Sequence, residues 1–161
     1  MKVVQWMTAV AGVATVLSVQ APDRALGAVG DAEVILYRFP GVVDNVGGGG
    51  ILGVATLFHC TNFSGVNETI RIVVRDVSAG VVANLAITLP HLRTITFSTH
   101  LVAFYLQTSL DTGVINPGTA AIAATSTSVV CTAMTIDAAS TSPVGIALHG
   151  VRFNPIPGSQ E

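Results

Sequence analysis

The sequence is poor in charged and aromatic residues. Only 10% of its 161 residues are charged and 6% are aromatic, whereas 50% are hydrophobic. A disordered chain has low hydrophobicity and high charge, so this composition excludes disorder as the state of the whole chain. Lysine occurs once, at Lys2, and there is no basic cluster. Nucleic acid is therefore not expected as a partner, nor is an anionic membrane surface.

Motifs for cofactors and metals are also missing. The glycine run at 47–50 is followed by a β-rich segment rather than a helix and contains no lysine, so it does not fit a phosphate-binding loop. The four histidines show no spacing typical of metal ligands, and each is expected at a strand edge or in a turn: His59, His91, His100 and His149. We expect no cofactor and no metal.

Helical periodicity is absent after the first 27 residues. Short β-rich runs separated by turn residues recur instead, and the run Thr69–Val77 alternates with Ile70, Ile72 and Val74 on one face. The expected strands are 32–43, 51–61, 69–77, 81–89, 93–99, 101–108, 119–126, 128–137 and 144–153. This pattern predicts a single all-β domain at 32–153, an antiparallel β-sandwich of the immunoglobulin-like or Greek-key type with about eight or nine strands. A closed barrel is the alternative.

The loops of this sandwich are the expected binding surfaces, because loops on a rigid framework carry recognition. The candidate loops are 44–50, 62–68 and 110–118, and the strongest turn signal is Asn116-Pro117-Gly118. The candidate binding residues within them are Asp44, Asn45, Asn62, Asn67, Asp111 and Asn116.

The N-terminus has the features of a secretory signal peptide. Met1-Lys2 precedes an apolar run at 3–19, and small residues follow at Ala21 and again around Gly27. We expect a signal helix in residues 1–27, with cleavage after Ala21 or near Gly27, and a secreted or periplasmic protein of the cell envelope. An uncleaved anchor in this segment is the alternative and would be the chain's only contact with a membrane. The Pro- and Gly-rich residues 154–161 are expected to form a flexible tail.

Cys60 and Cys131 are the only cysteines. In an oxidising compartment an even cysteine count predicts a disulfide. Strand alternation places Phe58 and Cys60 on the same face of one strand, and Val129 and Cys131 on the same face of another, so both sulfurs can point into the same core. A blue-copper site would need two histidines to converge with Cys131 and a methionine, but alternation turns His59 away from its neighbour Cys60.

Asp111 begins an Asp-Thr-Gly triplet, which carries the catalytic carboxylate in aspartic proteases. A single copy could work only in a homodimer, where two such carboxylates share a proton. The triplet is also common in β-turns and precedes the turn residues Asn116-Pro117-Gly118. An aspartic-type hydrolase that uses Asp111 is thus an alternative function, and an ordinary turn is the expectation.

Three segments, Phe58–Asn62, Val129–Ala138 and Leu148–Glu161, resemble small exported bacterial proteins with a Cys-Thr-Asn and a later Cys-Thr-Ala-Met. The resemblance implies a β-rich, exported and disulfide-bonded protein and transfers no catalytic residue. We therefore expect a non-enzymatic protein with a binding, adhesive or structural role. Its partner would be a protein, a glycan or a second copy of itself, as in a self-assembling surface layer or fibre.

Overall fold

The computed structural model describes residues 32–47, 50–142 and 144–153. The strands are β1 (Val34–Asp44), β2 (Val54–Asn62), β3 (Glu68–Arg75), β4 (Val81–Leu89), β5 (Thr94–Ser98), β6 (Thr108–Ser109), β7 (Ile115–Ala124), β8 (Val129–Asp137), β9 (Ile146–Leu148) and β10 (Val151–Arg152). No helix occurs in these ranges, so the described part of the chain contains none that could span a membrane. The predicted signal helix and the tail at 154–161 lie outside the described residues.

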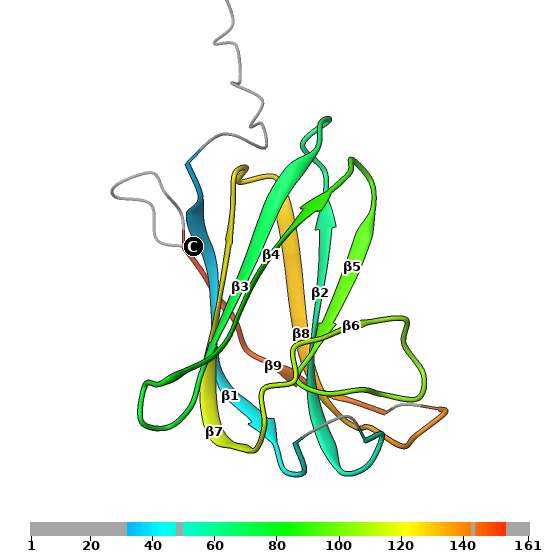
Figure 1. Ribbon diagram of the computed structural model, residues 1–161. Coiled ribbons are helices and arrows are strands. Elements are labelled where there is room, and N and C mark those ends of the chain that lie inside the picture. The colour runs from blue at the N-terminus through cyan, green and yellow to red at the C-terminus, as the bar shows by residue number, and fades with distance from the viewer. Residues whose placement is uncertain (1–31, 48–49, 143, 154–161) are drawn as a thin grey trace, which may run out of the picture.

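The strands form two five-stranded sheets, which confirms the all-β prediction (Figure 1). The first sheet has the order β10-β1-β7-β3-β4 and the second has the order β6-β5-β2-β8-β9. Every pair is antiparallel except β5 with β6. The chain changes sheet at most connections, and only β3–β4, β5–β6 and β8–β9 join strands that are neighbours in one sheet.

The two sheets pack on each other around a common apolar core. In β3, Ile70, Ile72 and Val74 are fully buried, as the alternation of the sequence predicts, while Arg71 and Arg75 face outward. The same core takes side chains from both sheets, namely Leu36, Phe39, Phe58, Cys60, Phe97, Ile122, Val129 and Cys131. Burial of these side chains supplies most of the favourable free energy of folding.

The apolar segment 101–108 is not the strand that the sequence predicts. Residues 101–107 form a loop, and Thr108 begins the two-residue strand β6. The apolar residues of this loop instead cover the outer face of the second sheet, where Val102 and Tyr105 pack with Leu57 and other members of a small second core. Both a strand and a covering loop need apolar residues, so composition alone does not distinguish them.

Asn116-Pro117-Gly118 lies inside β7, so the predicted turn at 110–118 is wrong in its second half. In this part β7 pairs with β1 only, and its pairing with β3 begins at Thr119. The register with β1 is also shifted here, which leaves room for a proline that cannot donate a ladder hydrogen bond. A Cβ atom at Gly118 would collide with the carbonyl oxygen of Arg75, so only glycine fits this position.

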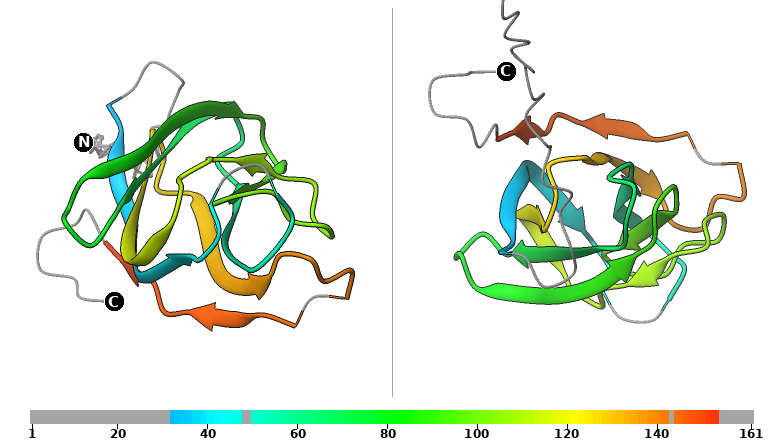
Figure 2. Two further views of the ribbon diagram at one scale, coloured as in Figure 1. Left: turned by 60° about the horizontal axis from the view of Figure 1, so that its bottom comes forward. Right: turned by 90° about the horizontal axis from the view of Figure 1, so that it is seen from above.

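The closing segment 144–153 is predicted as one strand but forms two. β9 pairs with β8 in the second sheet, and β10 pairs with β1 in the first. The segment therefore runs along one side of the molecule from sheet to sheet, coloured orange to red in Figure 2. Arg152 stacks over the ring of Tyr37, and Arg38 stacks over Phe153, which fixes the end of the segment against β1.

A disulfide joins Cys60 and Cys131, as predicted. The two residues lie directly opposite each other on β2 and β8, with their Cα atoms 4.2 Å apart, and both are buried in the main core. The bond therefore links two neighbouring strands of one sheet rather than the two sheets. It closes a loop across a sequence separation of 71 residues.

We expect the double variant Cys60→Ala/Cys131→Ala to lose about 4 kcal/mol of unfolding free energy, because the open chain gains loop entropy when it unfolds. Urea denaturation of oxidised wild type and variant measures this difference. Mass spectrometry without reductant checks the bond itself, since the wild-type chain should be lighter than its reduced form by two hydrogen atoms. Two free thiols in the native protein would contradict the expectation.

Candidate functional site

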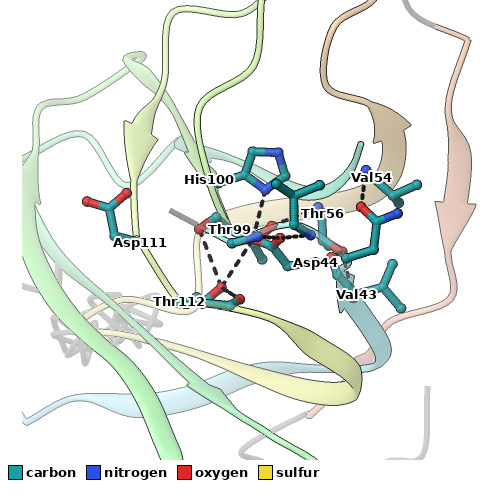
Figure 3. A network of polar contacts seen from close by, with 12 residues as sticks. Val43, Asp44, Val54, Thr56, Thr99, His100, Asp111 and Thr112 are labelled. Carbon is teal, nitrogen blue, oxygen red and sulfur yellow. Dashed lines mark hydrogen bonds and ion pairs between the residues drawn. The ribbon is translucent and has the colours of Figure 1, made fainter. Parts of the chain in front are cut away.

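A buried acid–base pair lies where the first sheet ends. Asp44 is the last residue of β1, and His100 follows β5 in the second sheet. The Oδ2 atom of Asp44 lies 2.8 Å from Nδ1 of His100, and both side chains are completely buried (Figure 3). The contact therefore bridges the two sheets in a setting from which water is excluded.

The partners of the His100 ring define its hydrogen bonds. Nε2 lies 3.0 Å from the carbonyl oxygen of Leu52, which can only accept, so Nε2 must carry a proton. The Oδ1 atom of Asp44 accepts hydrogen bonds from the backbone N–H groups of Val46 and Gly47, at 3.2 and 2.8 Å. Both oxygens of Asp44 and both ring nitrogens of His100 thus have hydrogen-bond partners although the two side chains are completely buried.

Three threonines surround this pair and connect the same segments. The hydroxyl of Thr56 exchanges hydrogen bonds with the backbone of Val43, and the N–H of Thr56 donates to Oγ1 of Thr99. The hydroxyl of Thr112 lies 3.5 Å from Oδ2 of Asp44, and the N–H of Thr112 donates to the carbonyl oxygen of Thr99 (Figure 3). Buried polar groups are thus satisfied within the network, which favours one arrangement of the loops.

The network holds three loops together. We call them the loop end: residues 45–47 and 50–53, residues 99–107, and residues 110–114. Close contact between two of them depends on Gly47, which has a φ of 70°, because a Cβ there would lie 2.9 Å from the backbone nitrogen of Val114. The loop 99–107 is joined through Ala138, whose carbonyl oxygen accepts from Ala103 and whose N–H donates to the carbonyl oxygen of Gly53.

The Asp44–His100 pair is not arranged for acid–base catalysis. In a catalytic dyad the nitrogen remote from the carboxylate faces the nucleophile and exchanges a proton with it. Here that nitrogen is bonded to the carbonyl oxygen of Leu52, and the ring has no exposed surface. The chemistry of this pair is therefore structural: it positions the loop end.

The opposite end of the molecule has its own polar anchor at Asn62. Its side-chain nitrogen donates to the carbonyl oxygens of Val66 and Leu89, and its Oδ1 accepts from the N–H of Ser64. Its backbone also bonds to the 92–93 turn. Asn62 thus organises the turns at that end in the way that Asp44 organises the loop end.

The predicted binding residues fall into two groups. Asp44 and Asn62 are fully buried and hold loops in place, so they are not available to a partner. The others are exposed, namely Asn45, Asn67, Asp111 and Asn116, and they are spread over both ends of the molecule. The carboxylate of Asp111 accepts a hydrogen bond of 2.7 Å from Ser109 and lies apart from the Asp44–His100 pair (Figure 3).

Sequence reasoning missed His100 as a functional position. It does follow a strand, as expected for a turn residue, but its burial and its partner were not predicted. Asp44 and His100 are 56 residues apart, and neither belongs to a recognisable motif. The one available signal was a histidine directly after the expected strand 93–99, and this position gave no information about its partner.

His59 lies within β2 rather than at a strand edge, which corrects the sequence-based expectation. It occupies the outer face of the second sheet, where its Nδ1 lies 2.9 Å from Oγ1 of Thr96 and its ring packs against Tyr105 of the covering loop. Burial lowers the pKa of His59 below its ordinary value, because the charged ring would lose hydration. Within the described ranges no group of three or more His, Cys, Asp or Glu side chains could hold a metal ion.

Large apolar side chains are exposed on the loop end. Leu106 is 99% exposed, Leu52 64% and Val114 63%. Phe104 and Ile51 are about half exposed in the same loops. The loop end thus combines a rigid buried support with an apolar outer surface, and its only charged side chain at the surface of the described residues is Asp111.

We expect Asp44→Ala to lower the free energy of unfolding by about 3–5 kcal/mol, because it leaves the buried His100 ring and the backbone N–H groups of Val46 and Gly47 without their hydrogen-bond partner. A double-mutant cycle with His100→Ala, followed by urea denaturation, should show that the double variant costs less than the sum of the single variants. Asp111→Asn is the control at an exposed position of the same loop end, because asparagine tolerates the left-handed backbone there (φ 47°) and can still accept from Ser109, and it should change stability by less than about 0.5 kcal/mol. Equal losses for Asp44→Ala and Asp111→Asn would contradict the structural role.

The lowered pKa of His59 predicts a pH dependence of stability. Its pKa is lower in the folded than in the unfolded chain, so protons bind the unfolded chain preferentially and stability falls as the pH drops below about 6.5. His59→Gln removes this group, and its stability should decline less than that of wild type between neutral and mildly acidic pH. NMR titration of the ring measures the pKa directly, and parallel stability profiles of the two proteins would contradict the prediction.

Comparisons with known proteins give a fold likeness at most. No family model and no curated protein sequence matches the chain. One solved structure that resembles it is the crystal structure of Thermotoga maritima 1070, with a TM-score of 0.47 and 13% identity. The match covers 74% of this chain and 94% of the other.

Proposed function

We propose that this chain is an exported, non-catalytic β-sandwich of the Greek-key type that recognises a protein or a glycan through its loop end. The observation that carries the proposal is that the buried Asp44–His100 pair and its hydrogen bonds fix three loops at one end of the sandwich. A partner then meets a surface that is already ordered, so little conformational entropy is lost on binding.

The surface chemistry of the loop end supports a binding role. Leu52, Leu106 and Val114 project from loops whose backbones are held by hydrogen bonds to the core. Exposed apolar side chains grouped on one surface are typical of interaction sites, whereas single ones are common anywhere. The contact would be mostly apolar, since Asp111 supplies the one exposed charge of these described loops.

Export is the second part of the proposal. It rests on the apolar N-terminal run 3–19 of the sequence and on the disulfide between Cys60 and Cys131, a bond that is rare in the cytosol. The oxidising envelope or the exterior is the compartment that suits both features.

A matched pair of variants tests the recognition surface. Leu106→Ser/Val114→Ser alters the loop end, and Phe63→Ser/Leu92→Ser alters two exposed apolar residues at the opposite end. All four side chains are more than half exposed, so both variants should fold like the wild type. We expect the first variant to weaken binding in glycan arrays and envelope pull-downs by at least about tenfold, and the second to leave it unchanged.

Two results would contradict the proposal. Equal binding by both variants would place recognition elsewhere, and absence of any retained glycan or protein would remove the binding role. Export is tested in the same preparation by the recovery of the chain: it should come from the periplasm or the medium, with an N-terminus after Ala21 or near Gly27. Recovery of the full-length chain from the cytosol would contradict that part.

A further inference from the structure

Strand β4 leaves a long edge of the first sheet open. Its nine residues, Val81–Leu89, pair with β3 on one side and with no described strand on the other (Figures 1 and 2). In an antiparallel edge strand, alternate residues direct their N–H and C=O groups away from the sheet. The strands at the other three sheet edges are much shorter, because β6 and β10 have two residues and β9 has three.

β4 lacks most of the usual protections of an edge strand. Natural edges carry charged side chains or proline, are kept short or contain a β-bulge, and β4 has only a register shift against β3 at its first residues, between Val81 and Ala83. Val81–Leu89 contains neither a charged residue nor a proline. On the adjacent strand β3, Arg71 is paired with Glu33 and donates to Oδ1 of Asn84. The edge is therefore open to hydrogen bonding with another strand.

The core-facing side chains of β4 are incompletely covered. Leu85 and Ile87 are partners of Ile72 and Ile70 on β3, which are fully buried. Leu85 and Ile87 pack against the same core but remain half-buried. A further strand at this edge would cover more of the apolar surface of these two side chains, which is favourable.

We propose that β4 pairs with β4 of a second copy of this chain to form a closed, two-fold dimer. Antiparallel pairing centred on Leu85 places Leu85 opposite its own copy and Asn84 opposite Ala86. The core-facing residues of both copies then lie on the same face of one continuous sheet. Because β4 carries no charge, no like charges face each other across the two-fold axis.

The same geometry favours a dimer over an open fibre. Pairing of β4 with itself uses one surface twice and leaves no second β4 edge to propagate. A fibre would instead need β4 to pair with a second, different edge, such as the residues of β1 and β8 that the short strands β10 and β9 leave without a described strand partner. The dimer is independent of the loop-end proposal, although it would present two loop ends to a multivalent partner.

The test is sedimentation velocity of the full chain with its disulfide intact, over a wide range of concentration. The double variant Asn84→Asp/Ala86→Asp places two new carboxylates opposite each other across the interface, and the two-fold axis repeats this contact. Within one chain the changes are mild, because a carboxylate at position 84 can still accept from Arg71 and Ala86 lies opposite Arg71. The control Thr94→Asp/Thr132→Asp adds the same charge at exposed positions of the second sheet.

We expect wild type and control to sediment as dimers, and the β4 variant to dissociate with a dissociation constant raised at least about tenfold. Circular dichroism and thermal unfolding establish that the β4 variant is folded, and the single variant Asn84→Asp serves as a second, isosteric test. A monomeric wild type would overturn the proposal, as would occupation of β4 by the chain's own termini. Undiminished dimerisation of both β4 variants would overturn it too, and open-ended assembly would overturn the closed dimer.

Discussion

The contact between Asp44 and His100 determines how the two sheets meet at the loop end. One residue ends β1 and the other follows β5, so the pair joins the two sheets beyond the reach of the disulfide, which lies within one sheet. Each side chain needs the other, because a buried polar group without a hydrogen-bond partner is costly. The loops that contribute Leu52, Gly47 and Thr112 cannot move apart without breaking hydrogen bonds to the pair. Order in these loops therefore originates in the core.

The disulfide has a different role, although its sequence position first draws attention. It links β2 and β8, which already exchange ladder hydrogen bonds, so it adds little to the contact between sheets. Its effect lies mainly in the unfolded chain, whose loop entropy it reduces. The sheets are held by apolar packing of residues such as Phe39 against Phe58, and by the buried polar pair. A stable β-rich module is thus compatible with very few charged residues.

Local periodicity was enough to predict part of this structure. Alternation at Ile70, Ile72 and Val74 gave the correct burial of β3, and the cysteine count with the same alternation gave the disulfide. Features that depend on distant partners were not predictable. The burial of His100 follows from Asp44, 56 residues earlier, and the loop 101–107 is recognised only by the sheet face that it covers. The proline in β7 is tolerated because of a register shift with β1, which no local pattern encodes.

The distribution of the few charges explains why one side of the molecule is closed and the other open. Arg38 and Arg152 stack on aromatic rings and fasten the closing segment along β1. Arg75 donates to the carbonyl oxygen of Ala79 and supports the β3–β4 turn, and Arg71 is held by Glu33. Each of these arginines contacts a turn, a neighbouring carboxylate or an aromatic ring, and none of them lies on β4. In a chain with 10% charged residues, an edge strand without charge is not unusual. The edge strand β4, however, is nine residues long and its core-facing side chains are half-buried, and these features favour pairing with another strand over exposure to solvent.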